Sequence, residues 1–174
     1  NPSAKLPMTF PAHVGQIPIY YQNKSTGRPT ALQQTYKASY IDASTEPAYP
    51  FGYGLSYTDF GYSDLKLLPG KAAGVHTEVS VKVTNTGKCA GEEVVQLYVQ
   101  DKVASVTRPI KELKGFRKIH LNAGESKTVV FQITDDALGF YDNEMNYMVE
   151  PGDFVFMVGG SSDDVQQITY NLKE

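Results

Sequence analysis

The chain has 174 residues, of which 41% are hydrophobic and 20% are charged, and its formal net charge at pH 7 is −3. This balance is typical of a soluble globular protein, and the negative charge argues against nucleic acid or an anionic membrane as the main partner. No apolar run approaches the roughly 18 residues needed to cross a bilayer, so no membrane span is expected.

Proline is concentrated at the start of the chain. Seven of the ten prolines lie in the first fifty residues: Pro2, Pro7, Pro11, Pro18, Pro29, Pro47 and Pro50. Because proline lacks a backbone N–H and biases its predecessor toward extended conformations, we expect neither long helices nor inner strands here. The chain begins at Asn1 rather than at Met and has no signal peptide, which indicates a cut end made by processing or by the choice of the expressed fragment.

The same segment is too apolar for a free linker. Its larger apolar residues are Leu6, Met8, Phe10, Val14, Ile17, Ile19, Tyr20, Tyr21, Tyr49, Phe51, Tyr53, Leu55, Tyr57 and Phe60. Disordered segments are poor in aromatic residues because they have no core to fill. We therefore predict that residues 1–58 form an extended arm. Its side chains would be buried against the following domain, against a domain outside this sequence, or against both.

From about residue 62, apolar and polar residues alternate, the spacing that places every second side chain on one face of a sheet. The apolar positions are Val79, Val81 and Val83; Val95, Leu97 and Val99; Val129, Phe131 and Ile133; and Ile168, Tyr170 and Leu172. Residues 154–158 are apolar throughout, as expected of a strand covered on both faces, and the arm is one candidate cover.

Turn residues separate these runs. Residues 85–87 read Asn-Thr-Gly and residues 122–124 read Asn-Ala-Gly. Pro151 and Gly152 are suited to positions i+1 and i+2 of a type II turn, which would give Gly152 a positive φ. Near Gly115 the alternation loses phase, which indicates a β-bulge.

These signals predict about seven strands and no helical period, the pattern of a two-sheet antiparallel sandwich. The single cysteine, Cys89, and the absence of tryptophan disfavour an antibody-type immunoglobulin domain. We therefore predict that residues 59–174 form an all-β, fibronectin type III-like (immunoglobulin-like) antiparallel sandwich behind the arm.

The residues that most often carry chemistry are scattered. The three histidines, His13, His76 and His120, do not have the sequence spacing of a metal-binding site. Two of them, His76 and His120, fall on the polar phase of their strands, so we expect them to be exposed to solvent. Cys89 lies in a polar turn without nearby partners. No G-x-S-x-G motif offers a serine nucleophile, and residues 52–56 are better explained as a tight bend among packed aromatics than as a phosphate loop. We expect no metal, no cofactor and no catalytic residue in this chain.

Paired carboxylates are the groups that glycoside hydrolysis needs, roughly 5–10 Å apart. The candidate pairs are Glu92 and Glu93, Asp135 and Asp136, and Asp163 and Asp164. Each pair lies at an expected strand end or turn, where local hydrogen bonding explains it. Neighbours on a strand also point to opposite faces, so we expect no shared catalytic pocket.

Two further groups have both a binding and a structural interpretation. The basic run comprises Arg108, Lys111, Lys114, Arg117 and Lys118. It could attract a polyanion, but basic residues on an edge strand also block strand-to-strand aggregation, which we favour. The twelve tyrosines could stack on sugar rings, but packing is the default at their positions. The substrate-binding residues are therefore unknown.

Four ordered motifs resemble the C-terminal region of family 3 glycoside hydrolases of the bacterial β-glucosidase type. They are residues 1–11 (NPSAKLPMTFP); residues 14–21 (VGQIPIYY) with 26–29 (TGRP); residues 49–58 (YPFGYGLSYT); and residues 150–154 (EPGDF) with 158–162 (VGGSS). The first resembles the last strand of that family's α/β sandwich domain, and the second resembles its interdomain connection. The third resembles the entry into a fibronectin type III-like domain, and the fourth the last hairpin of that domain.

This resemblance implies a retaining hydrolase that acts on β-linked glucosides or oligosaccharides. Its aspartate nucleophile and its acid/base glutamate would lie upstream of Asn1, in catalytic domains of the same polypeptide. The resemblance further implies a structural role for this segment, with the arm filling the seam between those domains, and a periplasmic or secreted enzyme. A homodimer is left open.

Two other functions remain alternatives. A stand-alone carbohydrate-binding module predicts sugar affinity for the isolated chain, whereas a purely structural segment predicts none. An adhesion or spacer domain of the fibronectin type predicts tandem copies joined by short polar linkers, which the apolar arm argues against.

Overall fold

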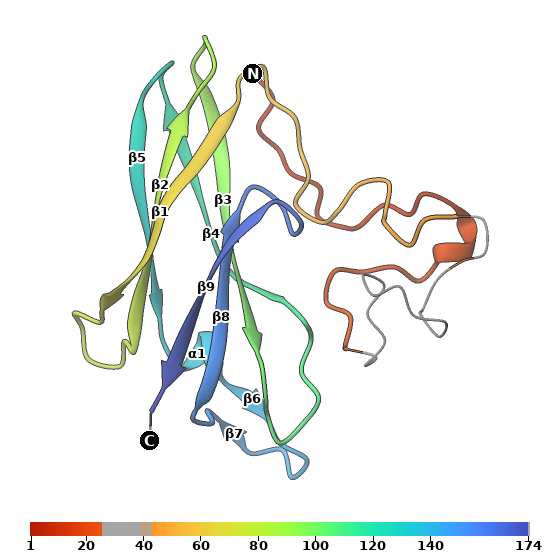
Figure 1. Ribbon diagram of the computed structural model, residues 1–174, viewed down its shortest axis with the longest axis vertical. Helices are drawn as coiled ribbons and strands as arrows, with labels where there is room; N and C mark the ends of the chain where they lie inside the picture. Colours follow the sequence, from red (N-terminus) through yellow and green to blue (C-terminus); the bar gives the residue numbers. More distant parts are fainter. Residues whose placement is uncertain (26–39, 41–42, 174) are drawn as a thin grey trace.

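Two antiparallel β-sheets pack face to face, and an arm extends from one side of them (Figure 1). The computed structural model describes residues 1–25, 40 and 43–173. The first sheet has the order β1-β2-β5, with β1 at Phe60–Pro69, β2 at Thr77–Asn85 and β5 at Ser126–Ile133. The second has the order β4-β3-β8-β9, with β4 at Glu112–Leu121, β3 at Gly91–Asp101, β8 at Gly152–Gly159 and β9 at Val165–Leu172.

Three small elements complete the described structure. The hairpin of β6 (Phe140–Tyr141) and β7 (Tyr147–Met148) projects from one end of the sandwich (Figure 1). A single helical turn, α1 (Asp135–Leu138), follows β5, and a 3-10 turn, η1 (Val14–Gln16), lies at the far end of the arm. The predicted all-β antiparallel sandwich is confirmed.

The core lies between the two sheets and is built from the alternating positions. Val79, Val81 and Val83 on β2 are fully buried, and they pack in one cluster with Leu97 of β3 and Phe156 of β8. Successive side chains of a strand point to opposite faces, so the three valines of β2 all reach this interior. The alternation read from the sequence therefore marks the buried face directly.

β8 is buried on both faces, as its apolar run predicts. Phe156 and its even-numbered neighbours enter the core between the sheets, whereas Val155 and Met157 form an outer cluster with Tyr98. The side chains of Tyr21 and Phe51 from the arm pack on that outer cluster. The arm is thus the cover predicted for the second face.

The β3–β4 pairing has the expected bulge. Leu97 pairs with Gly115 and Tyr98 pairs with Leu113, so Lys114 is the extra residue. A Cβ on Gly115 would lie 3.2 Å from the Phe131 ring, so glycine allows β4 to approach the opposite sheet at this point.

One turn prediction is wrong. Gly152 is not among the glycines of positive φ, and it already pairs with Leu172 as the first residue of β8. Strand pairing requires extended backbone, which overrides the type II turn that the Pro-Gly dipeptide suggested. Of the other two predicted glycine turns, the one at Gly124 has a positive φ of 75°, whereas Gly87 is not among the glycines of positive φ.

No helix among residues 1–25, 40 and 43–173 is both long and apolar enough to cross a bilayer.

Candidate functional site: the arm and its anchor

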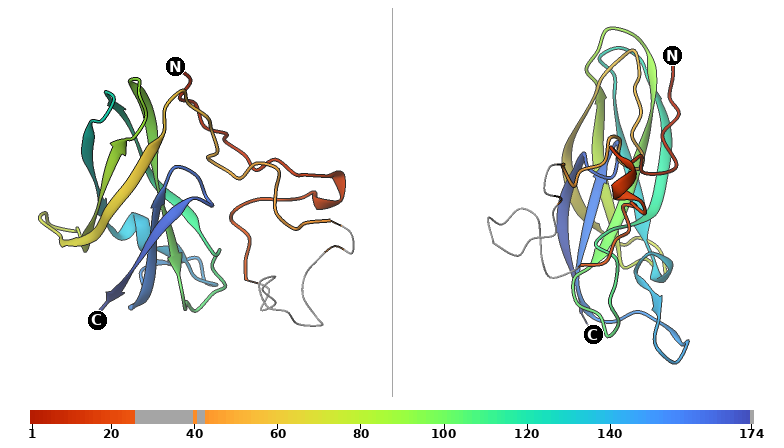
Figure 2. Two further views of the ribbon diagram at one scale, coloured as in Figure 1. Left: turned by 45° about the horizontal axis from the view of Figure 1, so that its top comes forward. Right: turned by 90° about the vertical axis from the view of Figure 1, so that its right-hand side faces the viewer.

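The arm runs out from the sandwich and back as an irregular two-stranded ribbon (Figure 2). The Leu6 N–H donates to the Tyr53 carbonyl at 2.8 Å, and the Gly52 N–H donates to the Leu6 carbonyl at 2.8 Å. Further out, Phe10 and Tyr49 form an isolated antiparallel bridge. These contacts hold together segments that are far apart in sequence.

The outgoing half also returns to the sandwich edge. Lys24 forms a bridge with Pro109, and the Ile110 N–H donates to the Asn23 carbonyl at 3.0 Å. The returning half contacts the β8–β9 turn, where the Ser162 N–H donates to the Phe51 carbonyl at 2.9 Å. The arm is therefore fixed to the sandwich at several separate points.

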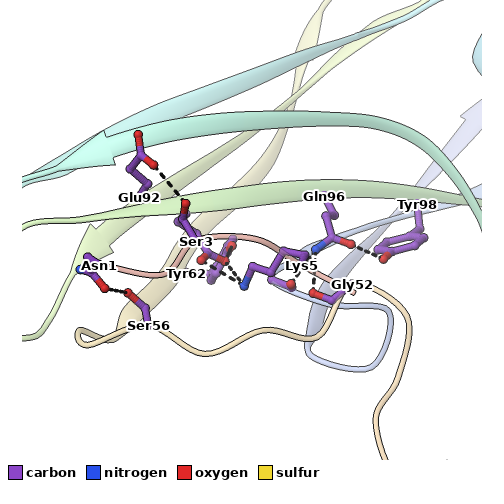
Figure 3. A network of polar contacts seen from close by, with 11 residues as sticks. Asn1, Ser3, Lys5, Gly52, Ser56, Tyr62, Glu92, Gln96 and Tyr98 are labelled. Atoms are coloured by element: carbon purple, nitrogen blue, oxygen red, sulfur yellow. Dashed lines mark hydrogen bonds and ion pairs between the residues drawn. The ribbon is translucent and has the colours of Figure 1, made fainter. Parts of the chain in front are cut away.

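The first five residues of the arm lie along β3 in a polar network (Figure 3). Asn1 Nδ2 donates to the Ala90 carbonyl at 2.7 Å, and Ser3 Oγ donates to a Glu92 oxygen at 3.1 Å. Lys5 Nζ lies 3.2 Å from both carboxylate oxygens of Glu93. The spacing of two residues is that of extended chain, in which alternate side chains face the same way.

Lys5, which is partly buried, forms an ion pair with the buried Glu93. Glu93 is almost fully buried, and its Oε1 also accepts a 2.8 Å hydrogen bond from the Tyr62 hydroxyl of β1. Burial, followed by the adjacent Glu93 charge, raises the pKa of Tyr62, so this hydroxyl stays protonated and acts as a donor. The pair connects the arm to both sheets at once.

Gln96 joins the arm to the β8–β9 turn. Its Nε2 donates to the Gly52 carbonyl at 3.2 Å and to the Gly160 carbonyl at 2.6 Å, and its Oε1 accepts from the Tyr98 hydroxyl at 2.5 Å (Figure 3). Gly52 has a φ of 78°, and a Cβ there would lie 2.1 Å from Gln96 Oε1. Residue 52 must therefore be glycine for two independent reasons.

Gly52→Ala is expected to lower the free energy of unfolding of the chain by about 3 kcal/mol, from positive-φ strain and overpacking together. Gly124→Ala is the matched control, because Gly124 has a φ of 75° and a Cβ added to it would meet no other atom within 4 Å. That variant should lose only about 1 kcal/mol, the strain alone. Urea unfolding of both variants measures the difference, and equal losses would contradict the close Gln96 contact.

The outer surface of the arm is strongly apolar. The exposed large apolar side chains of its described part are Met8, Phe10, Val14, Ile17, Tyr20, Tyr40, Tyr49, Leu55 and Tyr57. Leu55 and Tyr57 are 72% and 79% exposed. Isolated apolar side chains are common on protein surfaces, but so many in one short segment are typical of an interaction surface.

A cavity of about 640 Å³ lies between the arm and the sandwich. Tyr20, Tyr21 and Pro50 of the arm line it on one side, and Ile110 and Lys111 of the sandwich line it on the other. Lys111 Nζ donates to the Ser162 carbonyl at 2.5 Å. The cavity is therefore a feature of the arm–sandwich junction.

The carboxylate pairs do not assemble into one site. Glu92 accepts from Ser3 and forms an ion pair with Lys118 at 2.7 Å, whereas its neighbour Glu93 pairs with Lys5. Asp163 and Asp164 bond through their backbone N–H groups to Ser161 Oγ.

The third carboxylate pair begins α1, where it contacts a histidine. Asp135 Oδ1 lies 2.6 Å from His76 Nε2. His76 is thus partnered rather than simply solvated, contrary to the sequence interpretation, because α1 folds back beside the start of β2. His120 is exposed as predicted.

The basic run lies on the edge strand β4 and just before it, as its structural interpretation requires. Arg108 pairs with Glu112, Lys114 also lies within 3.8 Å of Glu112, and Lys118 pairs with Glu92. These partners leave little free positive charge. Within the described ranges, no group of three or more His, Cys, Asp or Glu side chains is placed to bind a metal ion.

Comparisons with known proteins match this arrangement. Residues 93–162 match the fibronectin type III-like domain family. Over 99% of its length the chain is 49% identical to a periplasmic β-glucosidase of Salmonella typhimurium, of which it spans 23%. It is 45% identical to a putative β-xylosidase of Formosa agariphila, of which it spans 22%. The crystal structure of a β-glucosidase from Listeria innocua in complex with glucose superposes with a TM-score of 0.91 at 43% identity, over 99% of this chain and 24% of that chain.

The sheet arrangement and the matched family define a fibronectin type III-like domain, which confirms the predicted fold class. The similarity to the β-glucosidases extends over the arm as well as the sandwich. Both the arm and the sandwich are therefore similar to part of these β-glucosidases, as the four motifs indicated. Residues 26–29 of the second motif lie outside the described residues.

Proposed function

We propose that this chain is the C-terminal structural portion of a retaining β-glucosidase-type glycoside hydrolase, whose catalytic domains lie upstream in the same polypeptide. The observation that carries this proposal is the apolar outer surface of an arm that is itself fixed to the sandwich. Exposed apolar side chains such as Leu55 and Tyr57 are stabilised when a folded partner buries them. The chain spans less than a quarter of the length of the Salmonella and Formosa relatives, which supports a partner in the same polypeptide.

The arm and the sandwich have separate roles in this proposal. Residues 1–58 are the interdomain connection and residues 59–174 are the fibronectin type III-like domain; the start of β1 at Phe60 supports this division. The Lys5–Glu93 pair and the Gln96 contacts fix one side of the arm, so its other side is presented as a preformed surface. A preformed surface loses little conformational entropy on docking.

The chemistry belongs to the upstream domains. The aspartate nucleophile and the glutamate acid/base that the resemblance implies match no motif of this sequence, and its paired carboxylates contact separate partners. The substrates of the intact enzyme are β-linked glucosides or related oligosaccharides, which the β-glucosidase and β-xylosidase relatives support. The periplasmic Salmonella relative supports a periplasmic or secreted enzyme. The homodimer stays a prediction.

Leu55→Asp tests the docking surface. In the intact enzyme this variant is expected to lower the melting temperature by about 5 °C, because a buried, unpaired carboxylate costs roughly 2 kcal/mol or more. In the 174-residue chain the same residue faces water, so its melting temperature should stay within about 1 °C of wild type.

Val103→Asp is the matched control, since Val103 is 80% exposed and lies outside the arm. It should leave both melting temperatures unchanged. An intact enzyme that tolerates Leu55→Asp as well as it tolerates Val103→Asp would show that the arm surface is free, and would favour the stand-alone carbohydrate-binding or adhesion module.

A further inference from the structure

The β6–β7 hairpin has a second group of exposed aromatic side chains, at the other end of the sandwich from Asn1 (Figure 1). Tyr141 is 59% exposed and Tyr147 is 46% exposed, and Met145 between them is also exposed. All other exposed tyrosines of the described residues belong to the arm. Docking of the arm therefore leaves these two unexplained.

The hairpin is held in one conformation by its own turn. The Asp142 carboxylate accepts hydrogen bonds from the backbone N–H groups of Glu144 and Asn146, both at 2.8 Å, and from Asn146 Nδ2 at 3.1 Å. The bond from the Asn146 backbone is the main reason that the pKa of Asp142 is lowered. The two tyrosines are thus presented on a preorganised support, which reduces the entropy lost when a ligand binds.

The two rings form a corner. Tyr141 and Tyr147 are cross-strand partners, their ring centroids are 5.2 Å apart, and their planes meet at 61°. The Tyr147 ring lies on the backbone of Gly139, where a Cβ would be 2.4 Å from its Cζ, and its hydroxyl donates to the Asp135 carbonyl at 3.1 Å. Because the rings meet edge to face instead of stacking on each other, open ring surface remains toward solvent.

Acidic groups border this corner. Asp135 and Asp136 lie close enough to the Tyr147 hydroxyl to contribute, after burial, to the raised pKa of Tyr147. A protein partner covering the corner would have to desolvate these carboxylates. The exposed large apolar side chains of the hairpin are Tyr141, Met145, Tyr147 and Met148. The hairpin alone is therefore much smaller than one side of a typical stable protein interface, which takes in roughly 20–30 residues of all kinds. A sugar chain fits better, because its C–H faces pack on aromatic rings while its hydroxyl groups donate to the Asp136 carboxylate and to the Asp135 oxygen that does not contact His76.

We propose that Tyr141 and Tyr147 form an ancillary carbohydrate-binding site that takes a β-linked glucan or xylan chain. The site does no chemistry; it would hold a substrate chain on the enzyme. The choice of β-linked sugars rests on the proposed function. From the sequence alone, sugar affinity of the isolated chain was expected only for a stand-alone carbohydrate-binding module. With the hairpin and the arm as separate surfaces, one chain can both bind sugar and have the structural role.

Native affinity electrophoresis of the 174-residue chain tests this site, in gels that contain mixed-linkage β-glucan, xylan or α-linked pullulan. Wild type is expected to be retarded by one or both β-linked polymers and not by pullulan. Tyr141→Ala and Tyr147→Ala should each raise the dissociation constant about fivefold, whereas Tyr141→Phe should keep the ring and the binding. Whichever β-linked polymer retards the chain identifies the sugar.

Tyr57→Ala is the matched control, because Tyr57 is an exposed tyrosine of the arm. It should bind like wild type. Equal mobility in all gels, or equal loss of binding in Tyr57→Ala, overturns the proposal. So does a lower melting temperature of the intact enzyme in Tyr141→Ala with unchanged binding, which would make the hairpin a domain contact. The Leu55→Asp experiment is independent of these results, so failure of the sugar site and failure of the arm surface are distinguished.

Discussion

Lys5→Met is expected to lower the free energy of unfolding of the chain by about 3 kcal/mol and to release the start of the arm from β3. The substitution keeps the length of the side chain but removes its charge, so the buried Glu93 carboxylate loses its counter-ion and keeps the hydrogen bond from the Tyr62 hydroxyl. A buried charge that loses its counter-ion is far more costly than the net contribution of the intact pair. Urea unfolding measures the stability, and limited proteolysis should show faster cleavage within residues 1–10.

A double substitution separates the interaction energy of the Lys5–Glu93 pair from the contribution of each side chain alone. Lys5→Met with Glu93→Gln should recover part of the loss, because no uncompensated charge remains, and the double-mutant cycle gives the coupling between the two groups. Lys71→Met is the matched control: Lys71 is 77% exposed and lies 3.9 Å from the buried Glu78. A solvent-exposed ammonium contributes no more than about 1 kcal/mol. If Lys5→Met and Lys71→Met have the same small effect, the proposed anchoring by Lys5 is wrong.

Phe156→Ala is expected to destabilise the chain by about 3–5 kcal/mol, which corresponds to a fall in melting temperature of about 10 °C or more. Phe156 is fully buried at the centre of β8, and its ring is stacked against Tyr170 of β9 at a centroid distance of 5.8 Å. Truncation removes the transfer free energy of the ring and leaves a cavity that close-packed sheets cannot fill.

Phe116→Ala makes the same chemical change at a surface position, since Phe116 is exposed on the edge strand β4. Its effect should stay within about 0.5 kcal/mol. Thermal and urea unfolding of the two variants compare them directly. A small effect of Phe156→Ala would mean that the two sheets can close over the vacated volume.

The arm and the hairpin divide the exposed aromatic residues into two groups with different expected partners. The described part of the arm exposes nine large apolar side chains, which suits burial against a folded domain. The hairpin surface is small and bordered by Asp135 and Asp136, which suits a polyhydroxylated ligand. The sequence alone does not separate the twelve tyrosines, because the residue type is the same and only its surroundings differ.

Several local features were predictable from residue order. The valines of β2 and the two-faced run of β8 indicated both the strands and their burial, because the side-chain period of a strand equals the period of the pattern. The bulge near Gly115 was visible as a loss of phase. The hairpin was not predicted, because β6 and β7 have two residues each and are too short to show any period.

The amino-acid sequence alone therefore determined the all-β sandwich and the extended arm. Each of them depends on the apolar spacing, the proline content or the composition of a short segment of the chain. Only the tertiary structure decided that Lys5 meets Glu93 across 88 residues, that His76 contacts Asp135, and that Gly152 is extended and not part of a type II turn. The physical reason is the same in each case. Long-range packing selects partners that are distant in sequence, and its free energy exceeds the weak local preferences that a single sequence displays.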